Sequence, residues 1–115
     1  MSLVSLGAEG FSIICNADGS VLANAKPPVA AANTIVVTNG ASIYKNLVFA
    51  ADSEAGLYMY VATPANVGLP TSKCQTMTLT EVGYLNFGSK ISANAVEFKN
   101  NNLIVATGTG VRGLA

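Results

Sequence analysis

The chain has 115 residues, of which 50% are hydrophobic and 10% are charged, against roughly 25% charged residues in an ordinary soluble domain. Six basic and six acidic residues cancel without forming a run of one sign, so the chain lacks the positive field that binding to nucleic acid requires. The apolar runs are interrupted and much shorter than the roughly 20 residues of a membrane-spanning helix, so we expect no transmembrane segment.

The first third of the sequence predicts a meander of short strands. Apolar runs place these strands at residues 3–6, 11–15 and 20–23. A turn at residues 7–10 separates the first two, and residues 16–19 predict a tight turn because Asn, Asp and Gly tolerate left-handed backbone. Pro27 and Pro28 end the third strand, since proline cannot donate a hydrogen bond to a sheet. Residues 30–32 are expected to be a connector.

The remainder predicts more strands and no helix. Strands are expected at residues 34–38, 41–44, 47–51, 57–61, 75–82, 95–99 and 103–107, with a short segment at 84–87. β-Branched residues favour the first of these, and Asn39-Gly40 predicts a turn after it. Residues 63–73 are expected to be irregular. Because no stretch repeats apolar residues every 3.6 positions, we expect an all-β fold of antiparallel meander sheets.

One sequence motif, called the repeated phrase below, occurs three times. It consists of an aliphatic run, a small polar turn, and then Gly followed by an apolar residue. The copies begin at Leu3, Leu47 and Leu103 and lead to Gly10, Gly56 and Gly113. Their starts lie 44 and 56 positions apart, near the roughly 40–50 residues of a four-stranded propeller blade. We therefore expect one region of partial β-propeller blades, with approximate units at residues 1–33, 34–73 and 74–115. A β-sandwich is the alternative.

Each part of the repeated phrase has a physical role. The aliphatic runs are apolar at successive positions, which predicts strands covered on both faces between neighbouring blades. The glycines are expected to supply positive φ in a hairpin, so Gly56→Val should destabilise its hairpin. Only about two blades are present, whereas closed propellers use roughly 4–8. We therefore expect either that the chain is part of a longer propeller or that separate copies of it complete one another's blades through exposed sheet edges.

Several segments together resemble a known repeat family. They are residues 82–85, 93–100, 103–108 and 113–114, with residues 56–60 and 63–64 resembling the strand that closes a preceding unit. This pattern is similar to the LVIVD-type β-propeller repeats of bacterial surface and secreted proteins. The resemblance implies a rigid circular scaffold used for binding, often outside the cytoplasm, with no shared catalytic set.

The cysteines and the absence of histidine limit the chemistry of the chain. Cys15 and Cys74 are far apart and belong to no C-x-x-C pair, so a zinc site is not expected. Two half-buried strand cysteines that never meet are favoured over a disulfide. Without histidine, no Ser-His or Cys-His nucleophile pair exists within one chain. We expect no catalytic residues, no metal and no cofactor.

The turns contain the weak candidates for binding. Asp52 and Glu54 share one turn, where a solvated turn is favoured over a calcium site because six to eight oxygen ligands are not available. Glu9 is assigned to the comparable turn of the first unit and Arg112 to that of the third, so the turns differ in charge as binding loops do. Residues 108–113 spell G-x-G-x-x-G, but no helix follows, so a flexible hairpin is favoured over a dinucleotide site.

The aromatic residues are expected to lie mainly in the cores of the blades. A platform that stacks on sugars is the alternative, and Tyr84, in a short loop segment, is its best candidate.

Three classes of function stay open on the sequence. The first is a non-catalytic binding module, secreted, periplasmic or displayed on a bacterial surface, that recognises a protein or carbohydrate through blade loops. The second is a structural, adhesin-like subunit that assembles by strand exchange. The third is an enzyme whose site is shared between subunits, with carboxylates such as Asp52 or Glu81 converging at an interface.

Overall fold

A computed structural model describes residues 2–28, 34, 36–64, 76–88 and 91–114 of the chain. These residues form ten strands and no helix, which confirms the all-β prediction. The strands are β1 (Ser2–Ser5), β2 (Phe11–Ile14), β3 (Val21–Ala25), β4 (Gly40–Tyr44), β5 (Leu47–Ala51), β6 (Leu57–Pro64), β7 (Met77–Leu85), β8 (Ala93–Lys99), β9 (Asn102–Thr107) and β10 (Gly110–Leu114).

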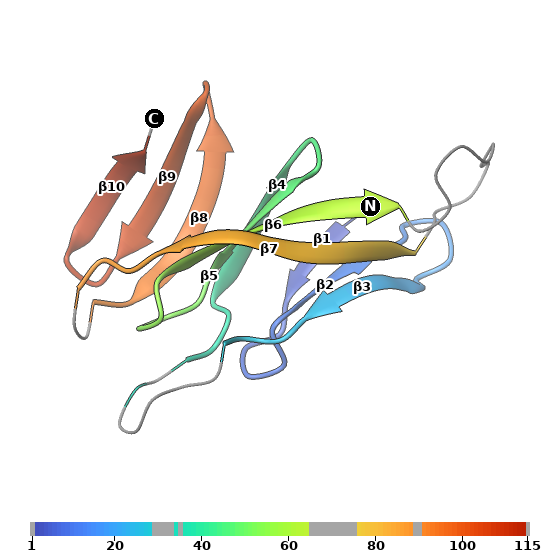
Figure 1. The fold of residues 1–115 in the computed structure, drawn as a ribbon, viewed down its shortest axis with the longest axis horizontal. Coiled ribbons are helices and arrows are strands. Elements are labelled where there is room, and N and C mark those ends of the chain that lie inside the picture. The colour runs from blue at the N-terminus through green and yellow to red at the C-terminus, as the bar shows by residue number, and fades with distance from the viewer. Residues whose placement is uncertain (1, 29–33, 35, 65–75, 89–90, 115) are drawn as a thin grey trace.

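The strands form three antiparallel sheets that follow one another along the chain (Figure 1). The first sheet has the order β1-β2-β3, the second β4-β5-β6-β7 and the third β8-β9-β10. Every neighbour in a sheet is also a neighbour in sequence, so each sheet is a meander, as predicted. Strands β4 and β8 contact each other, as do β1 and β4, so the sheets pack side by side.

Two hydrophobic cores lie between the sheets. The first core joins the first and second sheets and contains Phe11, Ile13, Cys15, Leu22, Val48, Ala50, Tyr60 and Ala62. The second core joins the second and third sheets and contains Phe49, Ala51, Leu57, Phe87, Ala93, Val96, Leu103 and Val105. Successive residues of β5 therefore enter opposite cores, and Val48 and Phe49 are both buried.

The prediction that all three aliphatic runs are covered on both faces is correct for β5 only. Val4 of β1 is 39% exposed and Ile104 of β9 is 37% exposed. The reason is positional, since within the described residues the second sheet packs against two sheets, while the first and third each pack against one.

The turns after β1 and β5 have the same backbone geometry. The Leu6 amide donates to the Gly10 carbonyl oxygen at 2.7 Å, and the Asp52 amide donates to that of Gly56 at 2.8 Å. Gly7 bridges to Thr38 and Ser53 bridges to Ala93, so each turn also ties its sheet to the start of the next. Gly10 and Gly56 have φ values of +84° and +98°, as expected for the glycines of the repeated phrase.

The repeat is real in the first two sheets, but its alignment differs from the one that the leucines suggest. Leu3 pairs with Ile13, and Phe49 pairs with Met59. The separation along the chain between Leu3 and Phe49 is the same as that between the turn glycines, Gly10 and Gly56. Leu3 therefore corresponds to Phe49 rather than to Leu47. The β2–β3 and β6–β7 ladders also carry their bulges at matching points, Ile13/Ile14 and Met59/Tyr60.

The third copy is displaced as well. Asn102 and Leu47 each follow a two-residue turn, so Leu103 corresponds to Val48, and both side chains are buried. The glycine of the third hairpin is Gly110, with φ +134°, whereas Gly113 lies inside β10 opposite Ile104. A shift of one residue reverses the face of every side chain in a strand, which a match of apolar letters does not detect.

Two strand predictions are wrong. Residues 34 and 36–38 are not a strand, and Gly40 is not in a turn but begins β4 opposite Ala51. This segment crosses from the first sheet to the second, so its β-branched residues have no continuous partner strand. The segments expected at 75–82 and 84–87 form a single strand that ends at Leu85. Val82 is the extra, unpaired residue of a β-bulge, so pairing with β6 continues on both sides of it.

The unit boundary at residues 73 and 74 also changes. Strand β7 pairs with β6, so it closes the second sheet, and the third sheet begins only at Ala93. Residues 30–32, and residues 65–73 of the expected irregular piece, lie outside the described residues. Thr63 and Pro64 belong to β6.

Candidate functional site

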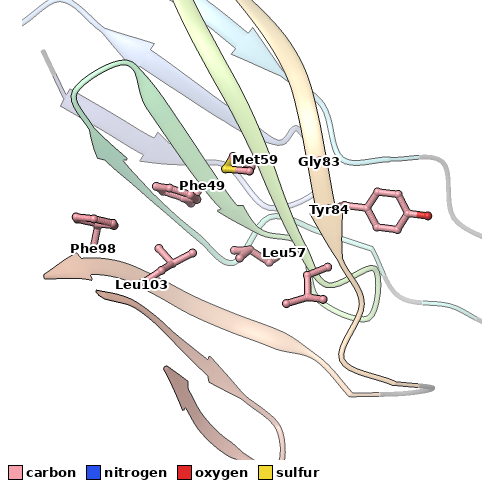
Figure 2. Close-up of a pocket in the computed structure, with 8 residues that line it drawn as sticks. Phe49, Leu57, Met59, Gly83, Tyr84, Phe98 and Leu103 are labelled. Atoms are coloured by element: carbon pink, nitrogen blue, oxygen red, sulfur yellow. The ribbon is translucent and has the colours of Figure 1, made fainter. Parts of the chain in front are cut away.

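An open, mainly apolar pocket of about 360 Å³ lies between the second and third sheets. Figure 2 shows its lining. The residues are Phe49, Leu57, Met59, Gly83, Tyr84, Leu85, Phe98 and Leu103. Its size lies in the range of small-ligand sites, roughly 300–1,000 Å³.

Alternation along β6 and β7 produces one wall of this pocket. Leu57 and Met59 are two residues apart on β6 and point to the same side of the sheet. Leu85 pairs with Leu57, and Gly83 pairs with Met59. Because Gly83 has no side chain, the centre of this wall is hollow.

Aromatic stacking fixes the opposite side of the pocket. The ring of Phe98 on β8 stacks on Tyr44 with centroids 4.1 Å apart, and lies parallel to Phe49 at 6.2 Å. This pair of contacts joins the first two strands of the second sheet to the first strand of the third. The pocket is therefore held open by packed rings rather than by a loop.

Tyr84 lines the pocket but its ring points away from the other lining side chains (Figure 2). The ring stacks on Tyr58, which lies opposite on β6, with centroids 5.3 Å apart. It is 66% exposed. Among the aromatic residues, Tyr84 therefore provides an exposed ring face, although it lies in a strand and not in the loop segment expected.

Asp52 is not the solvated turn residue that the sequence suggested. Its side chain is 1% exposed, and its Oδ1 accepts a hydrogen bond from the Thr38 hydroxyl at 2.6 Å. Burial raises the pKa of the Asp52 carboxyl, the Thr38 hydrogen bond partly opposes this, and the charge of Glu81 adds to the rise. Asp52 is therefore a buried structural group rather than a cation ligand at the surface.

A polar junction surrounds this aspartate. Asn39 donates to the Ser53 hydroxyl oxygen at 2.8 Å and to the Ala93 carbonyl oxygen at 3.3 Å. Ser53 in turn donates to the Val37 carbonyl oxygen at 2.9 Å. The junction connects the turn after β5 to the entries of the second and third sheets.

The Asp52 charge also affects the first core. Tyr60 packs edge-to-face against Phe11 at 5.5 Å. Burial raises the pKa of Tyr60 to about 12, with the charges of Asp52 and Glu81 adding to the effect.

The remaining candidates lie at separate places. Glu9 forms an exposed ion pair with Lys26 at 2.9 Å, which lowers the pKa of the Glu9 carboxyl. Glu54 lies in the turn after β5 and is partly exposed. Arg112 is in β10 opposite Val105, not in the third turn, and its guanidinium lies 5.3 Å from the centre of the Phe87 ring. The structure does not bring these residues into one cluster.

The bond of Cys15 corrects another expectation. Cys15 is 1% exposed in the first core and is disulfide-bonded. The prediction of two cysteines that never meet is therefore wrong for Cys15. Cys74, the other cysteine of the chain, lies outside the described residues.

The sequence alone did not predict the pocket, because its lining comes from five strands in two sheets. One available signal was Gly83 within a strand, since glycine there often marks a bulge or a close approach. Among the described residues, no group of three or more His, Cys, Asp or Glu side chains could hold a metal ion. In the same part of the chain, no helix is long and apolar enough to cross a membrane.

No family model, no curated protein and no solved structure matches this chain.

Proposed function

We propose that the chain is a non-catalytic binding or scaffold module of a bacterial surface or secreted protein. In this proposal its sheets are blades like those of LVIVD-type β-propellers, and it recognises a protein or carbohydrate through the turns at one side of the sheets. The turns after β1, β5 and β9 lie toward the lower side of the view in Figure 1, opposite the turns after β4 and β8.

The observation that carries the proposal is a repeated backbone with varied side chains. The turns after β1 and β5 share their hydrogen bonds and their glycines. Between these fixed points the residues are Gly7-Ala8-Glu9 in one turn and Ser53-Glu54-Ala55 in the other. Loops that vary on a rigid, repeated scaffold are typical of binding surfaces.

The packing of the sheets supports the assignment to blades. The second sheet is covered on both faces, and the first and third sheets each use one face for a core. Stacked repeats gain stability in this way, because one unit cannot bury its apolar surface alone.

The buried disulfide at Cys15 supports a location outside the cytoplasm. Disulfides persist in oxidising compartments and are rare where cellular thiols keep cysteines reduced. The low charge and the Thr- and Asn-rich surface are compatible with this location but do not require it.

The arrangement of acidic residues favours binding over catalysis. The sequence has no histidine, and Asp52, which has a raised pKa, is enclosed by protein and hydrogen-bonded to Thr38. Glu9 is paired with Lys26 at a different turn. These groups offer no nucleophile with an adjacent base.

Binding of the whole chain to a glycan array and to a panel of purified extracellular-matrix proteins tests the proposal. Glu9→Ala or Glu54→Ala should weaken the binding about tenfold, the effect of roughly 1.4 kcal/mol. Asp18→Ala and Lys45→Ala, at turns on the opposite ends of β2 and β5, are the matched controls and should leave it unchanged. Binding to no member of either set, or equal losses in the controls, would contradict the proposal.

A further inference from the structure

The stacked tyrosines Tyr58 and Tyr84 lie on the face of the second sheet that is turned away from the pocket. They pair directly between β6 and β7, and Tyr58 packs against the first core. Figure 2 shows the Tyr84 ring pointing away from the other side chains that line the pocket. Both rings therefore lie on the side of the second sheet that faces the first sheet.

A carboxylate shares this face with the two rings. Glu81 lies opposite Tyr60 and, after the bulge in β7, Tyr84 lies opposite Tyr58. Tyr60 is buried in the first core, and alternation places Tyr58 on the same side of β6. Because directly opposite residues point to the same side of a sheet, Glu81 and Tyr84 project from this face as well.

Stacking leaves one face of the Tyr84 ring open to solvent. The centroids of the two rings are 5.3 Å apart, and the rings are 15° from parallel. Tyr58 is partly buried against the first core, whereas Tyr84 is 66% exposed. Tyr58 therefore covers one face of the Tyr84 ring and fixes its orientation, and the other face is accessible to a ligand.

The charges close to the two rings are negative. Burial raises the pKa of the Tyr58 phenol, and Glu81, Tyr84 and Asp52 raise it further through their charges. Glu81 is exposed and forms no ion pair with a described residue. Its carboxylate is therefore available to balance a positive charge on a ligand.

The described basic residues are paired with other groups or lie on the third sheet. They are Lys26, which pairs with Glu9, Lys45 and Arg112, which lie over the rings of Tyr44 and Phe87, and Lys99 at the end of β8. Within the described chain, the negative charge beside Tyr58 and Tyr84 is thus not neutralised by an ion pair.

An open tyrosine ring beside a carboxylate suits an organic cation. The face of an aromatic ring is negative and attracts a cation within about 6 Å of its centroid. A primary ammonium such as that of lysine is strongly hydrated and loses water on contact with a ring. A methylated ammonium is better suited, because its methyl groups make apolar contact with the ring while its charge is retained.

We propose that Tyr84, Tyr58 and Glu81 bind a small organic cation that carries a methylated ammonium group. The ammonium lies over the open face of Tyr84, Tyr58 supports that ring from behind, and Glu81 supplies the opposite charge. This inference rests on the proposed function in treating the chain as a binding module, and its site is distinct from the turns. A neutral sugar gains less from the charge of Glu81, and it is an outcome of the test.

Choline chloride is the probe. Titrated into the ¹⁵N-labelled chain at constant ionic strength, it should shift the amide signals of Tyr58, Glu81 and Tyr84. The control ligand is the neutral tert-butyl analogue of choline, which has the same shape but a carbon atom in place of the ammonium nitrogen. It should bind roughly fivefold more weakly than choline, since it lacks the cation–π attraction and the charge interaction with Glu81.

Variants of Tyr84 test the role of the ring. Tyr84→Leu should weaken choline binding at least fivefold, because it removes the ring face. Tyr84→Phe keeps the ring and should bind choline within about twofold of the wild type. Thermal melting of both variants verifies that they fold, as expected for an exposed position.

A variant of Glu81 tests the role of the charge. Glu81→Gln should weaken the binding of choline about threefold and leave the binding of the neutral analogue unchanged, because only the cation interacts with the charge. The matched control is Glu97→Gln, which removes an exposed carboxylate from β8 on the third sheet. It should leave the affinity for choline unchanged.

Four results would overturn the inference. They are no binding of choline, equal affinity for choline and its neutral analogue, choline shifts at Phe98 and Leu103 of the pocket in place of the tyrosines, and equal losses in Glu81→Gln and Glu97→Gln. Shifts at Tyr84 with methyl glucoside but not with choline would assign the rings to a sugar instead.

The inference and the proposed function can fail separately. If choline does not bind while Glu9→Ala and Glu54→Ala weaken ligand binding, only this inference fails. If choline binds and no ligand uses the turns, the proposed function fails instead.

Discussion

The hydroxyl of Thr38 donates a hydrogen bond of 2.6 Å to Oδ1 of Asp52, and both side chains are buried. Thr38 precedes β4 and bridges to Gly7 in the turn after β1, whereas Asp52 follows β5. The bond therefore joins the segment that connects two sheets to the turn that is repeated in both. It also compensates a carboxylate that burial places in an unfavourable environment.

Thr38→Val should destabilise the protein, because it keeps the shape of the side chain but leaves the buried Asp52 carboxylate without this donor. The expected loss at neutral pH is about 1.5–3 kcal/mol in the free energy of unfolding, typical of hydrogen bonds to charged groups. Urea denaturation measures it. Thr78→Val, at an exposed position of β7, is the control and should change stability by less than about 0.5 kcal/mol. Equal losses in both variants would show that the bond adds nothing.

Asp52→Asn should make the protein more stable at neutral pH. The pKa of Asp52 is raised above its ordinary value of 3.8 in the folded state, so the folded state holds the proton more tightly than the unfolded state. Its contribution to stability is fully present below pH 3.8 and is lost as the pH rises through the folded pKa. The asparagine keeps an acceptor for Thr38 and carries no charge.

The melting temperatures of wild type and Asp52→Asn, followed from acidic to neutral pH, test this sign. The difference in favour of the variant should grow as the pH rises. Other carboxyls, including Glu9 and Asp18 with lowered pKa values, titrate in both proteins and cancel in the difference. A difference that shrinks with rising pH would mean that Asp52 is stabilised in its charged form.

Gly10→Ala and Gly56→Ala should cost similar amounts, because the two glycines occupy equivalent turns. Both have positive φ, and a β-carbon would overlap the backbone oxygen of Ala25 or of Leu85. The expected loss is about 2–4 kcal/mol each, from backbone strain and steric overlap. Gly7→Ala is the control, since Gly7 also has positive φ but open space around it, and should cost about 1–2 kcal/mol. A large difference between Gly10→Ala and Gly56→Ala would contradict the equivalence.

Loss of the disulfide at Cys15 should destabilise the protein by about 2–5 kcal/mol, the usual range for small secreted domains. Urea denaturation with and without a reducing agent measures this difference. Alkylation of the unfolded, unreduced protein, followed by mass spectrometry, is the chemical test. Cys15 should be modified only after reduction, and modification before reduction would refute the bond.

Local sequence patterns were sufficient for the class of fold and for most strands. The strands at residues 47–51 and 57–61, the tight turn at residues 16–19 and the glycines at positions 10 and 56 depend on neighbouring residues, so they could be predicted from the chain alone. The strand expected at residues 34–38 failed because strand formation needs a partner, and this segment passes between two sheets. The glycine of the third hairpin was wrongly assigned to Gly113 instead of Gly110, because a match of apolar residues in the sequence does not determine which residues of two strands pair.

The sequence by itself determined an all-β meander with a repeated hairpin, since backbone preferences and side-chain alternation are local properties. Only the tertiary structure decided which faces are covered, which is why Asp52 is buried, Tyr84 is exposed and β5 enters two cores. The pocket has the same origin. It exists because Leu57, Gly83 and Leu103, which come from three different strands, are brought together by the packing of the second sheet against the third.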